Sequence, residues 1–238
     1  CVAVPKAEHR LRIKGVKSTL FSQGLPTGAF LDLGDGVAIS SPELLFVEMA
    51  AVMEPAVHLL FGMELCGTYV RDASNPRGGT VTYWVKPATT TARIKAFVDG
   101  CKRVHGIQPA RQTLEWLTDN AWSPMEAVVA ALAMLPGELL GYDLWPVDLN
   151  VRKEVGSHAD KAERVPDMLF RGSGVGLNYD GEDHLPVQSV VDAAMQVARN
   201  PGAEDSERQL IQAVAAVRKR SVSDKRRDRD LGASGLTV

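Results

Sequence analysis

The sequence predicts a mixed α/β protein, in which a smaller α+β N-terminal region precedes an α/β C-terminal domain with a partly antiparallel sheet. Apolar residues recur at helical spacing in several segments, whereas short β-branched runs end in glycine-rich turns. In the second half these segments follow the order helix, three strands, helix, strand, which is typical of an α/β domain. The composition, 45% hydrophobic and 24% charged, is that of a globular chain.

The N-terminal region, residues 1–118, is expected to contain short strands followed by helices. Ser41 before Pro42 has the pattern of an N-cap and a first helical residue, and a second helix is expected to begin near Glu54-Pro55. The other expected elements are a strand within 11–20, a hairpin over 29–40, a strand over 80–87, and helices over 89–104 and 109–120. We place the domain boundary near Thr118 to Ala121.

The C-terminal domain, residues 119–238, is expected to begin with a helix after Ser123-Pro124. Met168-Leu169-Phe170 and Gly176-Leu177-Asn178 are expected to pair as antiparallel strands, because the turn sequence "RGSG" separates these two apolar runs. The remaining expected elements are a strand within 142–155, helices over 188–200 and 206–235, and a last strand from residue 236. The chain begins without Met and ends early in that last strand, so we expect it to be part of a longer protein.

The charge and the cysteine content exclude some classes of function for this chain. The net charge of −2 argues against a polyanion binder by bulk charge, but residues 208–230 hold eight Lys or Arg against three Asp. Three cysteines without a Cys-x-x-Cys pair argue against a disulfide framework or a zinc site, and favour a reducing cytoplasm. The most apolar stretch, residues 44–66, is interrupted by charged residues and proline, so no membrane partner is expected.

Acidic residues crowd together at the end of one predicted strand, in "VGLNYDGEDHL" over residues 175–185. Asp167 lies near the start of the preceding strand and Asp180 at the end of this one. If the hairpin forms, the two carboxylates lie on neighbouring strands and can share a divalent ion. Mg²⁺ needs only one or two protein carboxylates besides water and phosphate oxygens, and such an ion can activate water against a phosphodiester. Alternatively, Asp180-Gly181 is only a turn.

Three segments, "RVPDMLF", "VGLNYDGEDH" and "DKRRDRDLGASGLTV", resemble in order and spacing the very-short-patch-repair endonuclease superfamily over roughly residues 122–238. The preceding helices also resemble actinobacterial proteins labelled antitoxin-like or transcriptional regulators. The resemblance implies a restriction-endonuclease-like PD-(D/E)XK fold, a mixed sheet flanked by helices, acting on DNA with Mg²⁺. It implies that Asp167 and Asp180 are the metal carboxylates, Glu126 a helical acidic residue and His184 the imidazole of the catalytic site.

The chain departs from this family at one metal-binding position. Asn178 stands where the family has Glu, so the ion would lose a full charge from its ligands. No lysine follows two residues later, although Lys153 on an earlier strand is a candidate substitute. Two functions therefore stay open: a Mg²⁺-dependent DNA endonuclease with impaired activity, and a non-catalytic regulatory or antitoxin-like nucleic-acid-binding protein on a degenerate nuclease fold.

Several of these residues have a structural alternative. Ser123 and Glu126 have the spacing of a capping box, and His184 can be a packing histidine. Arg220, Arg226 and Arg227 are candidate DNA contacts in the basic helix, although Arg227 can instead pair with Asp224. The four tryptophans are expected to lie in the core rather than to stack on bases; they are Trp84, Trp116, Trp122 and Trp145.

Overall fold

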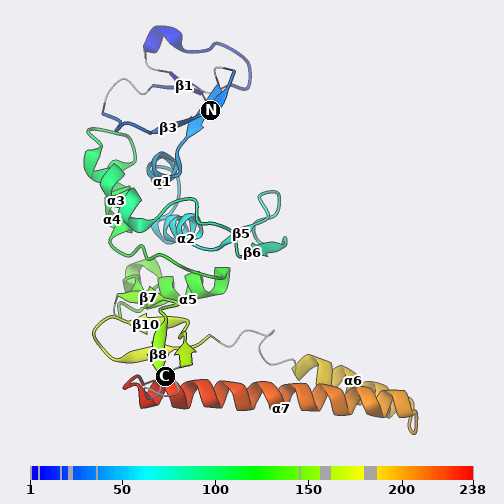
Figure 1. Cartoon of the computed structure of the whole chain (residues 1–238). Helices are drawn as coiled ribbons and strands as arrows, with labels where there is room; N and C mark the ends of the chain where they lie inside the picture. Colours follow the sequence, from blue (N-terminus) through cyan, green and yellow to red (C-terminus); the bar gives the residue numbers. More distant parts are fainter. Residues whose placement is uncertain are drawn as a thin grey trace. The chain divides into compact units, whose positions relative to one another are not determined.

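The chain divides into two compact units, residues 1–149 and residues 150–238 (Figure 1). The computed structural model describes residues 2–4, 6–16, 18–20, 24–35, 37–144, 146–155, 162–179 and 187–237. The first unit extends past the boundary expected near residues 118–121, because helix α5 (Pro124–Met134) packs against helix α2 (Pro55–Cys66). The structure confirms a mixed α/β protein with small, mostly antiparallel sheets.

Short strands open the first unit. Strand β1 (Val2–Val4) pairs in parallel with β2 (Ser18–Leu20), which is the only strand that the structure describes within the expected segment 11–20. Strands β3 (Phe30–Gly34) and β4 (Val37–Ser40) form the antiparallel hairpin expected over residues 29–40.

The helices of the first unit begin at the positions that the sequence indicated or within two residues of them. Helix α1 (Pro42–Ala50) starts at Ser41, whose hydroxyl accepts a 3.2 Å hydrogen bond from the Leu44 amide. The same N-cap geometry starts α3 (Thr91–Gly100) and α5, whereas α4 (Ile107–Leu114) follows Gly106. Side chains from α1, α2 and α3 form the core of this unit, and the largest fully buried ones are Leu44, Phe46, Leu59, Met63 and Ile94.

Two ionisable side chains are buried within this helical core. His58 is 1% exposed, and its Nε2 donates a 2.8 Å hydrogen bond to the Phe46 carbonyl. Glu43 is 5% exposed and accepts from the Thr89 hydroxyl at 2.6 Å and from Arg93 at 2.9 Å. Both groups therefore tie neighbouring elements of the core together through polar contacts.

A second hairpin of the first unit, β5 (Tyr69–Arg71) and β6 (Val81–Tyr83), extends away from the helices (Figure 1). Strand β6 ends at Tyr83, earlier than the expected segment 80–87. The last strand of the unit, β7 (Val147–Leu149), packs against α5. Cys66 and Cys101 are buried free thiols, and burial raises the pKa of both.

The second unit contains two hairpins. Strand β8 (Lys153–Val155) pairs with β9 (Ala162–Arg164), and β10 (Met168–Phe170) pairs with β11 (Val175–Leu177). The pairing of β10 and β11 around the "RGSG" turn confirms the predicted hairpin, with the second strand beginning one residue earlier than expected. Thr237 forms a parallel bridge to Val175, which agrees with strand structure beginning near residue 236.

Two helices complete the second unit. Helix α6 (Val187–Arg199) runs beside α7 (Glu204–Ala233), the long basic helix that the sequence predicted (Figure 1). The 30 residues of α7 span about 45 Å. The C-terminal end of α7 packs against β8 and β9, where Leu231 is fully buried. None of the helices described here is both long and apolar enough to cross a membrane.

Candidate functional site

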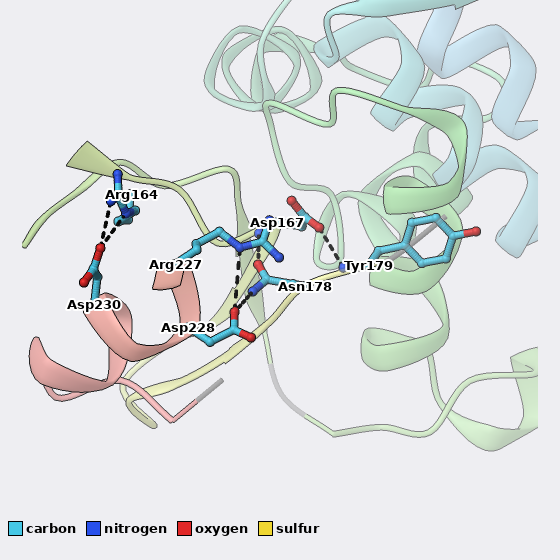
Figure 2. Close-up of polar contacts among 7 residues, drawn as sticks. All are labelled: Arg164, Asp167, Asn178, Tyr179, Arg227, Asp228 and Asp230. Atoms are coloured by element: carbon cyan, nitrogen blue, oxygen red, sulfur yellow. Dashed lines mark hydrogen bonds and ion pairs between the residues drawn. The ribbon is translucent and has the colours of Figure 1, made fainter. Parts of the chain in front are cut away.

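The open end of the β10–β11 hairpin holds Asp167 and Asn178, one position beyond the Met168–Leu177 pair (Figure 2). The Asp167 amide donates to the Asn178 side-chain oxygen at 3.3 Å. The Tyr179 amide donates to Asp167 Oδ2 at 2.6 Å. These two hydrogen bonds extend the strand pairing through side chains, so that Asp167 and Asn178 fix the end of the hairpin.

Helix α7 brings a further carboxylate to this position. Asn178 Nδ2 donates to Asp228 Oδ1 at 3.1 Å, and the Arg227 guanidinium lies 3.7 Å from the same oxygen (Figure 2). The side-chain amide of Asn178 therefore bridges the Asp167 backbone N–H, through Oδ1, and the Asp228 carboxylate, through Nδ2. Such an arrangement needs both a donor and an acceptor on residue 178, which an ionised Glu cannot provide.

A second contact anchors the same end of α7 (Figure 2). Arg164 on β9 donates to Asp230 Oδ2 through Nε at 3.0 Å and through Nη2 at 2.7 Å. Both side chains are 28% exposed. A charge-assisted contact with two N–H donors has a defined geometry, so this pair helps to fix the helix end beside Asn178.

The described residues of this site do not favour a tightly bound Mg²⁺ ion. Asp167 Oδ2 accepts the Tyr179 amide, the Asn178 oxygen faces the Asp167 amide, and the Arg227 cation lies beside Asp228. Among the residues that the structure describes, no three His, Cys, Asp or Glu side chains gather in a way that could hold a metal ion. Asp180 and His184, the other two predicted site residues at this hairpin, lie outside the described residues.

Glu126, the third predicted acidic residue, belongs to the first unit and to the start of α5. Its Oε1 accepts from the Ser123 hydroxyl at 3.0 Å, and its Oε2 accepts from the Trp122 amide at 2.9 Å. The Glu126 amide in turn donates to the Ser123 hydroxyl at 3.2 Å. The structure therefore shows the capping interactions that the sequence offered as an alternative, while a catalytic contribution stays a prediction.

The predicted DNA-contacting arginines differ in exposure. Arg220 and Arg226 are exposed on α7, whereas the Arg227 side chain is 22% exposed and belongs to the site around Asp228. Residues 218–230 carry seven Lys or Arg against three Asp, and the other exposed cations are Arg218, Lys219, Lys225 and Arg229. Arg218, Lys225 and Arg229 recur at intervals of seven and four residues, so they share one face of the helix.

One prediction about the aromatic residues was wrong. Trp84 is 76% exposed, because β6 ends at Tyr83 and Trp84 adopts a left-handed backbone with φ of 62°. Trp116 and Trp122 are half-buried, and Trp145 lies outside the described residues.

Sequence reasoning also missed the role of Asp228. Its position directly after Arg227, within the basic pattern "DKRRDRD", is the only signal that could have suggested it.

Comparisons with family models, with curated proteins and with solved structures find no match for this chain.

Proposed function

We propose that the second unit is a restriction-endonuclease-like module that binds DNA and whose Mg²⁺-dependent hydrolysis is impaired. The observation that carries the proposal is that the side-chain amide of Asn178 bridges the Asp167 backbone N–H and the Asp228 carboxylate. In the endonuclease family that the sequence resembles, an anionic Glu occupies this position and helps to hold the ion. Here a neutral amide joins strand to helix instead.

The electrostatics around Asn178 support the loss of metal affinity. Mg²⁺ gives up its hydration water reluctantly, and it is held by carboxylates rather than by neutral amides already engaged in hydrogen bonds. Arg227 places a fixed positive charge 3.7 Å from the Asp228 carboxylate. That charge already neutralises part of the negative potential that a cation would need. The same contacts favour a regulatory or antitoxin-like role if hydrolysis is lost altogether.

The exposed cations of α7 support DNA as the partner. The face formed by Arg218, Lys225 and Arg229 spans about 16 Å along the helix axis. Neutralising phosphates releases condensed counterions, and this release supplies most of the affinity of sequence-independent DNA binding. A helix that is anchored at one end through Arg164 and Asp230 can present these charges on a fixed surface.

The test is duplex DNA binding by the whole chain, measured by fluorescence anisotropy between about 50 and 200 mM salt. Replacing Arg218, Lys225 and Arg229 by Gln should lower the slope of log K against log salt by about 2.7 if each contacts one phosphate. The matched control replaces three exposed cations of the first unit, Arg10, Arg12 and Lys14. It should leave the slope unchanged. Equal slopes for the wild type and the α7 variant would refute DNA binding by this face.

A further inference from the structure

The first unit carries an aromatic surface at the end of the β5–β6 hairpin. Trp84 is 76% exposed and its neighbour Tyr83 is 50% exposed. The Trp84 ring lies 5.4 Å from the ring of Trp122, at an interplanar angle of 57°. Large aromatic side chains contribute most when they are buried in a core or an interface, so this degree of exposure calls for an explanation.

The backbone holds Trp84 in this exposed position. Its φ of 62° lies in the left-handed region, which a bulky residue adopts only when the surrounding structure enforces it. On one side, Tyr83 pairs with Tyr69 in the β5–β6 ladder. On the other, the Val85 amide donates to the Thr68 carbonyl at 3.0 Å. The exposed ring is therefore part of an ordered structure between two fixed backbone contacts.

The second ring of the pair is also fixed. Trp122 Nε1 donates to Asn120 Oδ1 at 2.9 Å, and its backbone amide donates to Glu126 Oε2 at 2.9 Å. The tilted contact with the fixed Trp122 ring therefore helps to hold Trp84, while 76% of Trp84 stays exposed to solvent. A rigid and largely exposed indole is suited to stack on a planar ligand, because little side-chain entropy is lost on binding.

The charges on the hairpin favour an anionic ligand. Lys86, two residues after Trp84, and Arg77, in the loop between β5 and β6, are both exposed. The nearby acidic side chains are engaged: Glu64 pairs with Arg71 at 2.6 Å, Asp72 accepts from the Ser74 amide and hydroxyl, and Glu126 accepts from the Ser123 hydroxyl and the Trp122 amide. Residues 69–86 carry three cations, Arg71, Arg77 and Lys86, against one anion, Asp72. A net positive hairpin disfavours the quaternary ammonium ligands that aromatic cages bind, and it favours a ligand that carries phosphates.

From these observations we infer that the β5–β6 hairpin is a binding site for single-stranded nucleic acid. An unpaired base stacks on the exposed indole of Trp84 and Lys86 neutralises a neighbouring phosphate, while Arg77, in the loop at the other end of the hairpin, neutralises a phosphate further along the strand. This site lies in the first unit and does not depend on the DNA contacts proposed for α7. Its preference is also different, since stacking requires a base that is free of its duplex partner.

The experiment measures binding of a short fluorescent oligothymidylate to the whole chain. Trp84→Ala should weaken the affinity by roughly 5- to 150-fold, the range that corresponds to stacking of one base on an aromatic side chain. Trp84→Phe should retain much of the affinity. Replacing Arg77 and Lys86 by Gln should lower the salt slope by about 1.4, because each phosphate contact on a single strand contributes roughly 0.7.

The matched control is Tyr142→Ala, which removes another aromatic side chain of the first unit that is 72% exposed. It should leave oligothymidylate affinity unchanged. The α7 variant with Arg218, Lys225 and Arg229 replaced should bind duplex DNA less tightly. In that variant, Trp84→Ala should still weaken oligothymidylate binding, so each proposal can be refuted without the other. An unchanged oligothymidylate affinity in Trp84→Ala, with circular dichroism as in the wild type, would overturn the inference. A lowered melting temperature without any loss of affinity would overturn it too, by assigning the ring to a structural contact.

Discussion

Acidification should destabilise the first unit through His58. Burial holds the pKa of His58 below its ordinary value of 6.5, although the hydrogen bond to the Phe46 carbonyl opposes that shift. Nε2 donates to that carbonyl, while Nδ1 has no hydrogen-bond partner among the described residues. Protonation would add a charge and an N–H donor to a side chain whose ring lies 4.2 Å from the ring of Phe46 and 6.5 Å from that of Phe61. The folded protein therefore favours the neutral form of His58.

The sign of the effect follows from proton linkage. The unfolded chain binds a proton at His58 near pH 6.5, and the folded chain binds it only at lower pH. The contribution of neutral His58 to the free energy of unfolding is therefore fully present above the unfolded pKa. It is lost as the pH drops below that value, by at most about 1.4 kcal/mol per pH unit. Between about pH 7.5 and pH 5, which lie on either side of the unfolded pKa, the stability of the first unit therefore falls. For a unit of this size, a loss of about 1.4 kcal/mol corresponds to a fall of about 3–6 °C in melting temperature.

The assay is thermal unfolding followed by tryptophan fluorescence at both pH values. His58→Gln keeps an amide donor for the Phe46 carbonyl but cannot titrate, so the difference between the wild type and this variant isolates His58 from other ionisable groups. On acidification the melting temperature of the wild type should fall further than that of the variant, by at most about 3–6 °C per pH unit. An equal loss in both proteins would refute the assignment of a buried neutral histidine.

Three further predictions concern other contacts. Trp84→Gly should be more stable than Trp84→Ala by about 1 kcal/mol in denaturant unfolding, because glycine adopts a positive φ without strain; equal stabilities would argue against the left-handed backbone. Arg164→Met should increase hydrogen exchange at the C-terminal end of α7, because Asp230 loses its charge-assisted partner; unchanged exchange there would contradict that anchoring role. Burial alone would raise the pKa of Glu43, but hydrogen bonds, chiefly from Thr89, outweigh it and lower the pKa. Glu43 therefore stabilises the fold above its unfolded pKa, and Glu43→Gln should reduce the loss of stability below about pH 4.5, as measured by urea unfolding.

Local chemistry made much of the secondary structure predictable. The Ser-Pro pairs at Ser41 and Ser123 mark helix starts because a hydroxyl N-cap and a proline at the first position both suit a helix terminus. The β10–β11 hairpin was predictable because Gly172 and Gly174, both with positive φ, allow the chain to reverse within four residues. These signals lie within a few residues of the element that they specify.

The candidate site was only partly predictable, because its contacts join distant segments. Asn178 and Asp228 are 50 residues apart, and no periodicity in the sequence relates a residue at the end of a strand to a residue on a distant helix. Sequence reasoning identified Asn178 as a departure from the endonuclease pattern but offered no reason for an amide there. The reason lies in two partners, the Asp167 amide and the Asp228 carboxylate, which become neighbours only on folding.

The exposure of Trp84 was also beyond sequence reasoning. An alternating, β-branched segment predicts that a tryptophan within it packs against a core. Strand β6 instead stops at Tyr83, and the left-handed Trp84 interrupts the strand before the Val85 amide bonds to the Thr68 carbonyl. Positive φ at a non-glycine residue is set by tertiary contacts, here those of Val85 and Trp122, and leaves no local signal.

The central claim, that Asn178 weakens a nuclease-like metal site, is tested most directly by calorimetric titration with Mn²⁺. The proteins to compare are the wild type, Asn178→Glu, and Asn178→Glu combined with Asp167→Ala. Asn178→Asp is the control that adds the same charge with a shorter reach. Asn178→Glu should bind Mn²⁺ more tightly than the wild type, because it places an anion between Asp167 and Asp228, and Asp167→Ala should remove that gain. No gain in Mn²⁺ affinity for Asn178→Glu, with circular dichroism unchanged from the wild type, would contradict the claim.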